Sequence, residues 1–492
     1  MPTGIPTIGW PEAPILILTA TAIVVLLADV ISAQRSPYLS LLIALVGMFA
    51  TLAVIAGKVP TDASAFGEFL QYDPIGRWGA MAVIIGGCLV GLVSIRTVQL
   101  YELPPAEYFA LLVFAVSGMV VLCVSVELFT IFLAVEVIAF SFYVLVGLTR
   151  GSTRSSEASL KYFILSAFSG GFLLYGFVFL YGSASGNSLV GKIGISIVQN
   201  HFDTWVTGCF ILGLSFALAG FAFKLTLAPF HLYAADVFEG APTPVSALLA
   251  TGSKVAGFVA LIHVLSPLRF RLGDILQQMP ADVETILWVL AAVSIIVGNL
   301  VALLQRNVKR MLAYSSVAHG GYLLIAGIVF VHGPALRIEV EKAIVIYVAA
   351  YILMNVAAFG VAATLGRRGE GDMEDYAGLA QQSPWLAAAM AVSMLSLTGI
   401  PATLGFVGKF YVFARAVESG YIILVVIAVL GSAVSAYYYL RVVVFMYMRD
   451  PTAEAGFGPT GLIQNLGLWL TVAPIVVFGV LPQWLVIILN RI

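Results

Sequence analysis

Long apolar runs alternate with short polar connections along the whole chain. A membrane-spanning helix needs about 20 mostly apolar residues, and fourteen segments of the 492-residue chain meet that requirement. We therefore predict an all-α polytopic membrane protein with about 14 transmembrane helices. The predicted helices cover residues 12–33, 38–57, 78–98, 105–124, 127–149, 157–183, 204–232, 241–266, 283–304, 308–331, 341–366, 384–417, 420–448 and 464–489. None of the connections is long enough for a soluble domain, so residues 1–492 are expected to form a single membrane domain.

Two of the predicted helices contain residues that interrupt a helix. The seventh carries Pro229 in "LTLAPFHLY", and the twelfth carries Gly399, Pro401 and Gly405 in "LTGIPATLGFVGKF". Proline removes a helical hydrogen bond and clashes with the preceding turn. Irregular backbone at membrane depth persists only where it is buried or lines a wet cavity. Interrupted helices at corresponding positions of two halves are therefore typical of a transporter site.

The two interrupted helices are five apart in the order along the chain. A unit of five helices crosses the membrane an odd number of times, so a second copy of it must start from the opposite side. We therefore predict two inverted five-helix repeats with broken helices 7 and 12: residues 105–266 (helices 4–8) and residues 283–448 (helices 9–13). Residues 1–100 would add helices 1–3, and residues 464–489 a C-terminal helix 14.

The composition supports a membrane protein and excludes other classes. Hydrophobic residues make up 61% of the chain and charged residues only 10%, whereas a soluble protein carries about 25% charged residues. The net charge of -1 gives no basis for a nucleic-acid partner. Lys and Arg are somewhat more frequent in the odd-numbered loops, which favours both termini on the outer side. The three cysteines are scattered in apolar runs, so we predict no metal site and no cofactor bound by this chain itself.

Four ionisable residues fall inside predicted spans: Glu136, Lys224, Lys254 and Lys409. A charge at the centre of a spanning helix costs about 2.5–3.5 kcal/mol on insertion scales, and such residues usually face a polar interior and mark ion pathways. The alternative is a long side chain near a helix end that reaches the membrane surface. Glu136 is too far from both ends of its span for that alternative, and Lys254 nearly so. We therefore predict that these four residues carry the transport chemistry.

A buried carboxylate and lysine at an adjustable distance form a proton switch, because burial lowers the pKa of a lysine in general and a nearby carboxylate raises it again. We assign Glu136 and Lys224 to such a pair. Lys254 would then pass a proton within the membrane towards Lys409. Five polar residues are predicted, as a secondary set, to bridge the gaps in this relay: His231, Ser253, Ser315, Ser316 and His319.

Three stretches closely resemble one known family. They are "KLTLAPFHLYAADVFEGAPTPVSALLATGSK", "QRNVKRMLAYSSVAHGGYLL" and "SSEASLKYFILSAFSGG". They resemble the antiporter-like membrane subunits of respiratory complex I, the NADH:quinone oxidoreductase, and the resemblance covers most of residues 105–450. A lysine in the twelfth helix, with no extra lateral helix appended, is most similar to the subunit N branch, called subunit 2 in mitochondria.

The resemblance implies proton translocation driven by electron transfer elsewhere in the complex. Glu136 and Lys224 would be the coupling ion pair, Lys254 the central relay residue and Lys409 the residue that exchanges with the outside. The chain would be a translocase subunit without a redox centre, and quinone, FMN and iron–sulfur clusters would belong to partner subunits. Neighbouring membrane subunits and lipids are the implied partners. The implied location is an energy-transducing membrane, either the bacterial plasma membrane or the mitochondrial inner membrane.

Two other functions remain open from the sequence. A subunit of a multi-subunit sodium/proton antiporter would share the fold and the charged residues without needing a redox partner. A non-transporting scaffold would have to explain the intramembrane charges as structural pairs, yet at least two lysines would then lack a carboxylate. Ferredoxin or a deazaflavin in place of NADH as the electron donor fits the first function as well.

Overall fold

The computed structural model describes residues 9–32, 36–193, 204–272, 279–332, 337–364, 371–451 and 461–491. The helices up to the middle of the chain are α1 (Ala13–Ser32), α2 (Pro37–Gly57), α3 (Pro74–Leu100), α4 (Pro105–Val124), α5 (Leu128–Val146), α6 (Thr153–Ser183), α8 (Thr204–Lys224), α9 (Ala234–Gly240), α10 (Thr243–Ala250) and α11 (Gly252–Leu272). They are followed by α12 (Met279–Leu304), α13 (Val308–His332), α14 (Arg337–Ala362), the 3₁₀ helix η2 (Met373–Tyr376), α15 (Leu379–Gln382), α16 (Pro384–Thr398), α17 (Leu404–Glu418), α18 (Ile422–Met448), α19 (Leu462–Val480) and α20 (Pro482–Arg491). Within these ranges, thirteen helical segments are long and apolar enough to cross a membrane.

Several helices begin where a polar residue caps free backbone N–H groups. Asp73 precedes the proline that opens α3 and accepts a hydrogen bond from the Gly76 N–H at 2.9 Å. Glu127 does the same for α5 through the Thr130 N–H at 2.6 Å. Such caps satisfy donors that no helical carbonyl can reach. They fix where α3 and α5 start, and hence which residues of α5 lie at mid-membrane.

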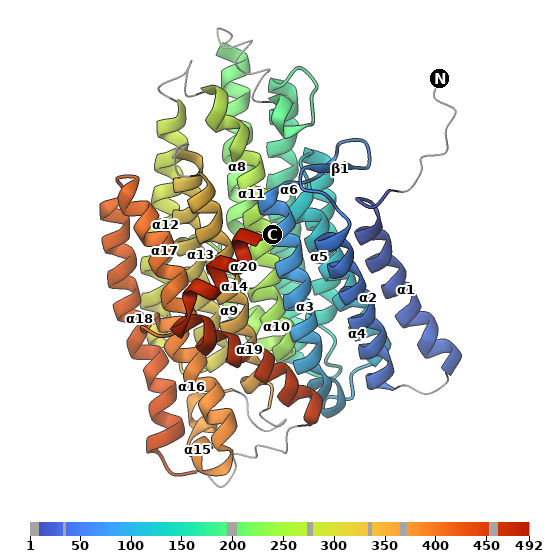
Figure 1. Cartoon of the computed structure of the whole chain (residues 1–492), viewed down its shortest axis with the longest axis vertical. Coiled ribbons are helices and arrows are strands. Elements are labelled where there is room, and N and C mark those ends of the chain that lie inside the picture. The colour runs from blue at the N-terminus through green and yellow to red at the C-terminus, as the bar shows by residue number, and fades with distance from the viewer. Residues whose placement is uncertain are drawn as a thin grey trace.

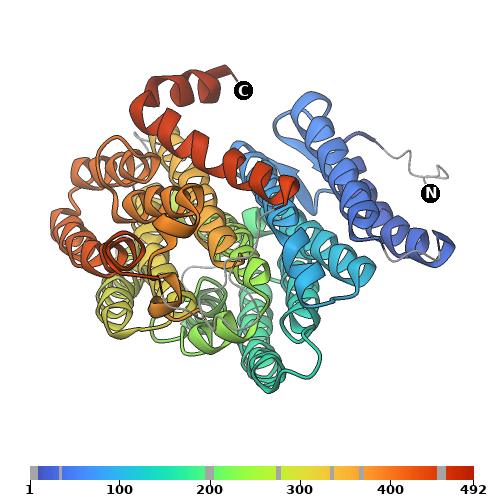
Figure 2. The ribbon, with the colours of Figure 1, turned by 90° about the horizontal axis from the view of Figure 1, so that it is seen from below.

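The helices run roughly side by side, with α1 and α2 at one edge of the molecule and α18 at the opposite edge (Figure 1). The span formed by α10 and α11 is buried along its whole apolar window, and α13 and α14 are mostly buried, whereas α1, α6 and α18 turn apolar side chains outward. Seen end-on, α19 crosses obliquely from the orange helices of the C-terminal half to the blue helices (Figure 2), and it packs on α3 as well as on α14, α16 and α17. The buried central helices are the ones that carry Lys254 and His319.

The structure agrees with the predicted break in helix 12 and adds a break that the sequence did not predict. Residues 384–417 form α16 and α17, separated at Gly399, which adopts a positive φ of 88°. The predicted helix 241–266 is divided at Thr251 into α10 and α11, so Lys254 lies in the first turn of α11 and not thirteen residues inside a continuous helix. The segment 464–489 is likewise divided, into α19 and α20, before Pro482.

The polar connection 58–77 contains a short antiparallel hairpin of β1 (Ala63–Ala65) and β2 (Leu70–Tyr72). Ala63 pairs with Tyr72, Ser64 with Gln71 and Ala65 with Leu70. The turn between the strands passes through Phe66, Gly67 and Glu68, all with positive φ, and β2 makes a further bridge to Ser125. The hairpin therefore packs at the C-terminal end of α4.

Candidate functional site

Lys224 is the last residue of α8, where the seventh span stops. Residues 225–233 that follow are not regular helix, and Thr226 has a positive φ of 58°. The side chain is buried, and its Nζ has no hydrogen-bond partner among the described residues. Its Cγ passes Gly257 of α11, where a Cβ would come within 3.2 Å of it. The stem of Lys224 therefore packs on α11 about one helical turn after Lys254.

Glu136 lies near the middle of α5 and is half-buried against α6. A Cβ on Gly170 would stand only 2.6 Å from Glu136 Oε1, so the carboxylate rests directly on the backbone of α6. No salt bridge joins the described side chains of Glu136 and Lys224, although their charges are near enough to interact. The helix α6 packs against both α5, which carries Glu136, and α8, which carries Lys224. Glu136 and Lys224, the predicted pair, therefore lie in the same region of the protein without forming a salt bridge.

Lys254 is buried at the break between α10 and α11, which the sequence did not predict. Its Nζ donates hydrogen bonds to the backbone carbonyl of Ser316 and, at 2.6 Å, to the Ser316 hydroxyl. The hydroxyl of Tyr351 lies 3.0 Å from Ser316 Oγ and donates to the carbonyl of Ala250, the last residue of α10. The ammonium is therefore held by Ser316 of α13, and Tyr351 of α14 joins that serine to the end of α10.

A group of aromatic and hydroxyl side chains continues from Lys254 into the second half of the protein. The ring of His319 lies 5.2 Å from that of Tyr351 and 5.4 Å from that of Tyr322, and its Nδ1 is 2.7 Å from the Tyr347 hydroxyl. The Tyr322 hydroxyl accepts from Asn299 at 3.3 Å and lies 3.5 Å from Ser432 Oγ. His319 therefore stands between the polar group around Lys254 and the one around Lys409.

Lys409 projects from α17 back onto the first half of its broken span. Its Nζ donates to the carbonyls of Leu397 at 2.9 Å and Thr398 at 3.0 Å, which are the last residues of α16. It also donates to Ser432 Oγ at 3.0 Å and lies over the Tyr322 ring at 5.1 Å. A cation at a helix C-terminus is stabilised by the carbonyls that lack helical partners. The break in helix 12 therefore supplies the carbonyls that bind the Lys409 ammonium.

All three lysines lie close to a break in a membrane-spanning helix of the described chain, but only Lys409 donates to carbonyls that such a break leaves free. The sequence revealed two of these breaks through proline. The third, at Thr251, has no proline, and the signal was Gly252 directly before "SK", because glycine is a weak helix former. The sequence analysis also did not predict four further residues of the site, because an isolated tyrosine or serine in an apolar helix is usually a packing residue. They are Tyr322, Tyr347, Tyr351 and Ser432.

The five secondary residues are placed differently. Ser316 and His319 lie on the route between Lys254 and Lys409. Ser315 bonds the Tyr439 hydroxyl on the neighbouring α18. His231, in the irregular segment after Lys224, is buried beside Tyr314, and its Nδ1 has no described partner. Ser253 is buried next to Lys254.

A charged network surrounds α9 at the membrane surface. Asp236 accepts from Lys161 of α6 at 2.7 Å and from Arg310 of α13 at 2.7 Å, and Arg310 also binds Glu239 at 2.7 Å. Partial burial works to raise the pKa of the Asp236 carboxyl, but the hydrogen bonds from Lys161 and Arg310 hold this pKa below its usual value. Asp236 therefore ties the first half of the chain to the second beside the broken segment. Among the described residues no cluster of His, Cys, Asp or Glu could hold a metal ion.

These features define a class of protein: a polytopic membrane protein with buried lysines seated at interrupted helices. The family model "NADH:quinone oxidoreductase/Mrp antiporter, TM" matches residues 125–435. The chain belongs to this family.

Curated relatives match almost the whole chain. NADH-quinone oxidoreductase subunit N of Trichlorobacter lovleyi is 38% identical over 96% of this chain and 94% of its own length. Subunit N of Myxococcus xanthus is 37% identical over 96% and 95%. The resemblance to the complex I antiporter-like subunits, expected from the sequence motifs, is thereby confirmed.

Solved structures share the fold. A chain of respiratory complex I from Thermus thermophilus is 30% identical, with a TM-score of 0.78 over 96% of this chain and 97% of that one. The Mrp complex from Dietzia contains a chain with a TM-score of 0.78 at 20% identity, over 95% of both chains. The second likeness shows the fold alone. The expected all-α membrane fold is confirmed by these comparisons and by the thirteen candidate spans.

Proposed function

We propose that the chain translocates protons across an energy-transducing membrane as an antiporter-like subunit of a respiratory NADH:quinone oxidoreductase. The observation that carries the proposal is the row of buried cations at helix breaks, from Lys224 through Lys254 to Lys409. Hydroxyl and imidazole groups lie between the last two. A buried ammonium that is not neutralised by a carboxylate is costly for a structural role. The same arrangement suits groups that gain and lose protons in turn.

The four charged residues have distinct roles in this proposal. Lys224 holds its proton when the Glu136 carboxylate is near and releases it when the carboxylate withdraws, and a shift of α6, which packs on the helices of both residues, would change their distance. Lys254 accepts a proton and passes it towards His319 through Ser316 and water. Lys409 receives it and exchanges it with the outer side. His231 and Ser253 support water between Lys224 and Lys254, and Ser315 supports it beside α18.

The energy for transport comes from partners. The chain is proposed to sit among other membrane subunits, with quinone, FMN and iron–sulfur clusters bound in the rest of the complex. Residues 105–266 and 283–448 are proposed to act as the two inverted repeats, with α19 packed on the second repeat and on α3. The sodium/proton antiporter alternative rests on the family model, whose description covers both kinds of protein, and on a fold likeness at 20% identity.

The test is Lys224→Ala in the intact complex, reconstituted in vesicles. We expect electron transfer and assembly to persist, while proton pumping per quinone reduced falls about tenfold or more, as for loss of a positioned proton-transfer group. Lys58→Ala, a lysine in a polar connection, is the matched control and should pump normally. Full pumping by Lys224→Ala would refute the proposal. A sodium gradient that drives proton movement without any electron donor would favour the antiporter instead.

A further inference from the structure

The first half of α6 turns a stripe of hydroxyl groups inward. The residues of this stripe are spaced alternately four and three positions apart, which places them on one side of the helix. They are Ser155, Ser159, Tyr162, Ser166 and Ser169. The residues that point outward between them are large, apolar and exposed: Phe163, Ile164, Leu165 and Phe168. In a helix that crosses lipid, hydroxyls gathered on the inner face have a role inside the protein.

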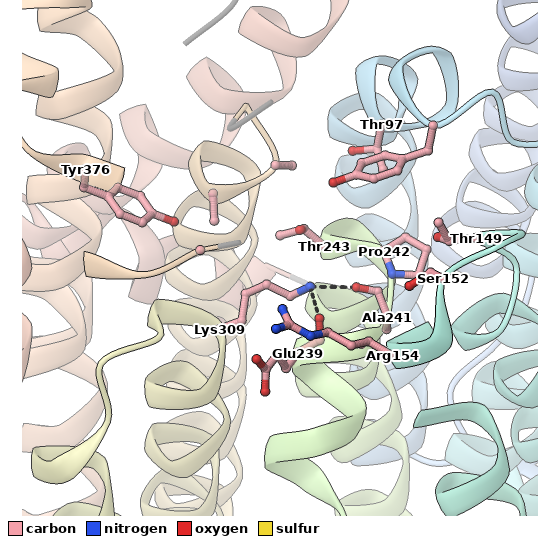
Figure 3. Close-up of a pocket in the computed structure, with 15 residues that line it drawn as sticks. Thr97, Thr149, Ser152, Arg154, Glu239, Ala241, Pro242, Thr243, Lys309 and Tyr376 are labelled. Carbon is pink, nitrogen blue, oxygen red and sulfur yellow. Dashed lines mark hydrogen bonds between the residues drawn. The ribbon is translucent and has the colours of Figure 1, made fainter. Parts of the chain in front are cut away.

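The stripe runs from a polar pocket to the carboxylate of Glu136. The pocket has a volume of about 200 Å³ and lies where α6 begins (Figure 3). Its wall there includes Thr149 and Ser152, the residue that caps α6. At the other end, Gly170 follows the last serine of the stripe and is the glycine on which Glu136 rests. Hydroxyl groups therefore recur on the inner face of α6 from the odd-numbered loop to mid-membrane.

Three serines of the stripe bond to backbone carbonyls of neighbouring helices. Ser155 donates to the carbonyl of Val146 at 2.7 Å. Ser159 donates to the carbonyl of Tyr143 at 2.7 Å, also near the end of α5. Ser169 bonds in the same way to α8, at 3.3 Å. Hydrogen bonds of this kind join helices inside a membrane, so these three serines have a structural explanation.

Tyr143 and Ser166 have no such explanation. Tyr143 lies two helical turns from Glu136 on the same face of α5, and its ring packs on Tyr162 with the centroids 5.4 Å apart. Its hydroxyl is buried and has no hydrogen-bond partner among the described residues. The buried hydroxyl of Ser166 and the Glu136 carboxylate are both near enough to interact with it. Since buried hydroxyls are almost always bonded, water is expected between these three groups.

We infer that Tyr143 and Ser166 are proton-transfer residues that connect the pocket at the start of α6 with Glu136. Each hydroxyl accepts a proton on its oxygen from one water and gives its own hydrogen to the next, so that no charge stays on the side chain. Water in the pocket supplies or receives the proton. The inference rests on the proposed function, in which Glu136 controls Lys224, and it adds the route by which this carboxylate gains and loses its proton.

The test measures how fast Glu136 takes up a proton in the intact complex. Photolysis of a caged acid starts the protonation, and time-resolved infrared spectroscopy follows the carboxyl C=O band, which Glu136→Gln identifies by its loss. No electron donor is added, so the rate is measured independently of pumping. Tyr143→Phe removes one hydroxyl and keeps the ring. Ser166→Val and Ser166→Thr introduce side chains of nearly equal volume that differ by one hydroxyl.

Two variants are the matched controls. Tyr175→Phe removes the hydroxyl of an exposed ring on α6. Ser141→Ala removes a buried hydroxyl of α5 that bonds to the carbonyl of Val137 in its own helix. In both variants Glu136 should be protonated at the wild-type rate.

We expect Tyr143→Phe and Ser166→Val to slow the protonation of Glu136 by about tenfold or more, as for loss of a positioned proton-transfer group. Ser166→Thr should restore the rate. The solvent deuterium isotope effect should rise in the slowed variants, because proton transfer then limits the rate, whereas a purely structural change would not raise it. Tyr143→Phe carries the test if Ser166→Val does not assemble.

Wild-type rates in both Tyr143→Phe and Ser166→Val would overturn the inference, and so would equal slowing in Ser166→Val and Ser166→Thr. This failure is distinct from that of the proposed function. Full pumping by Lys224→Ala refutes the proposed function, whereas an unchanged rate of Glu136 protonation in the hydroxyl variants refutes only the route described here.

Discussion

The ammonium of Lys254 and the hydroxyl of Ser316 form a hydrogen bond of 2.6 Å that joins α11 to α13. The same hydroxyl lies 3.0 Å from that of Tyr351, which closes the end of α10 by donating to Ala250. The central lysine, the helix break and the first polar group on the way to His319 are thus one bonded unit. A change at Ser316 should therefore act on proton transfer and not on packing alone.

Ser316→Ala removes this side-chain acceptor and leaves the backbone carbonyl in place. We expect proton pumping to fall by at least about tenfold, since the loss of a hydrogen bond to a charged group is worth about 1.5–3 kcal/mol. The fall in proton pumping is measured as vesicle acidification per quinone reduced. Ser393→Ala is the control, because Ser393 is also buried but bonds only to Ala389 of its own helix. Equal pumping by the two variants would contradict a relay role for Ser316.

Gly320 leaves open a space between the Leu225 carbonyl and the Lys254 ammonium. A Cβ there would lie 3.0 Å from the oxygen and 3.5 Å from Nζ. Gly320→Ala should exclude water from between Lys224 and Lys254 and slow pumping, while the complex still assembles. Gly327→Ala on the same helix is the matched control, because its Cβ would meet only apolar atoms, the nearest being Phe258 at 3.2 Å. If the two variants pump alike, water between the lysines is not required.

Tyr322 places its ring against Lys409 and its hydroxyl beside Ser432, and Tyr322→Phe separates the two effects. The ring contact with the ammonium remains, whereas the hydroxyl beside Ser432 is lost. We expect Tyr322→Phe to slow pumping severalfold, and Ser432→Ala to slow it more, because Ser432 bonds Lys409 directly. Tyr437→Phe, which changes an exposed tyrosine on α18, should have no effect. Normal pumping in Ser432→Ala would remove this group from the pathway.

Asp236→Asn should loosen α9 without touching the buried lysines. The change weakens two partly exposed ion pairs, so we expect a loss of about 1 kcal/mol in stability, together with reduced pumping. Because the pKa of Asp236 is lowered in the fold, its contribution is present above the usual carboxyl value of 3.8 and is lost as the pH falls through the lowered pKa. Thermal unfolding of the complex as a function of pH measures this. Glu157→Gln, which removes only the exposed partner of Lys161, should leave stability nearly unchanged.

The sequence by itself determined the membrane class, because segments of about 20 apolar residues have no other stable solution for their backbone in lipid. It also located the charged residues, since a charge inside such a segment stands out against its neighbours, and two of the breaks, since proline cannot continue a helix. The motifs around Lys224 and Lys254 were enough to indicate the family that the comparisons then established.

Only the tertiary structure decided how these residues are connected. The break before Lys254 depends on Tyr351 of another helix, whose hydroxyl bonds the last carbonyl of α10. The position of the Lys409 ammonium depends on the carbonyls of Leu397 and Thr398, which the break in its own span leaves free. The contacts of His319, Tyr322 and Ser432 join helices far apart in the chain, where an apolar pattern gives no pairing information. The periodicity of a helix tells which residues share a face, but the partner of that face is fixed by packing in three dimensions.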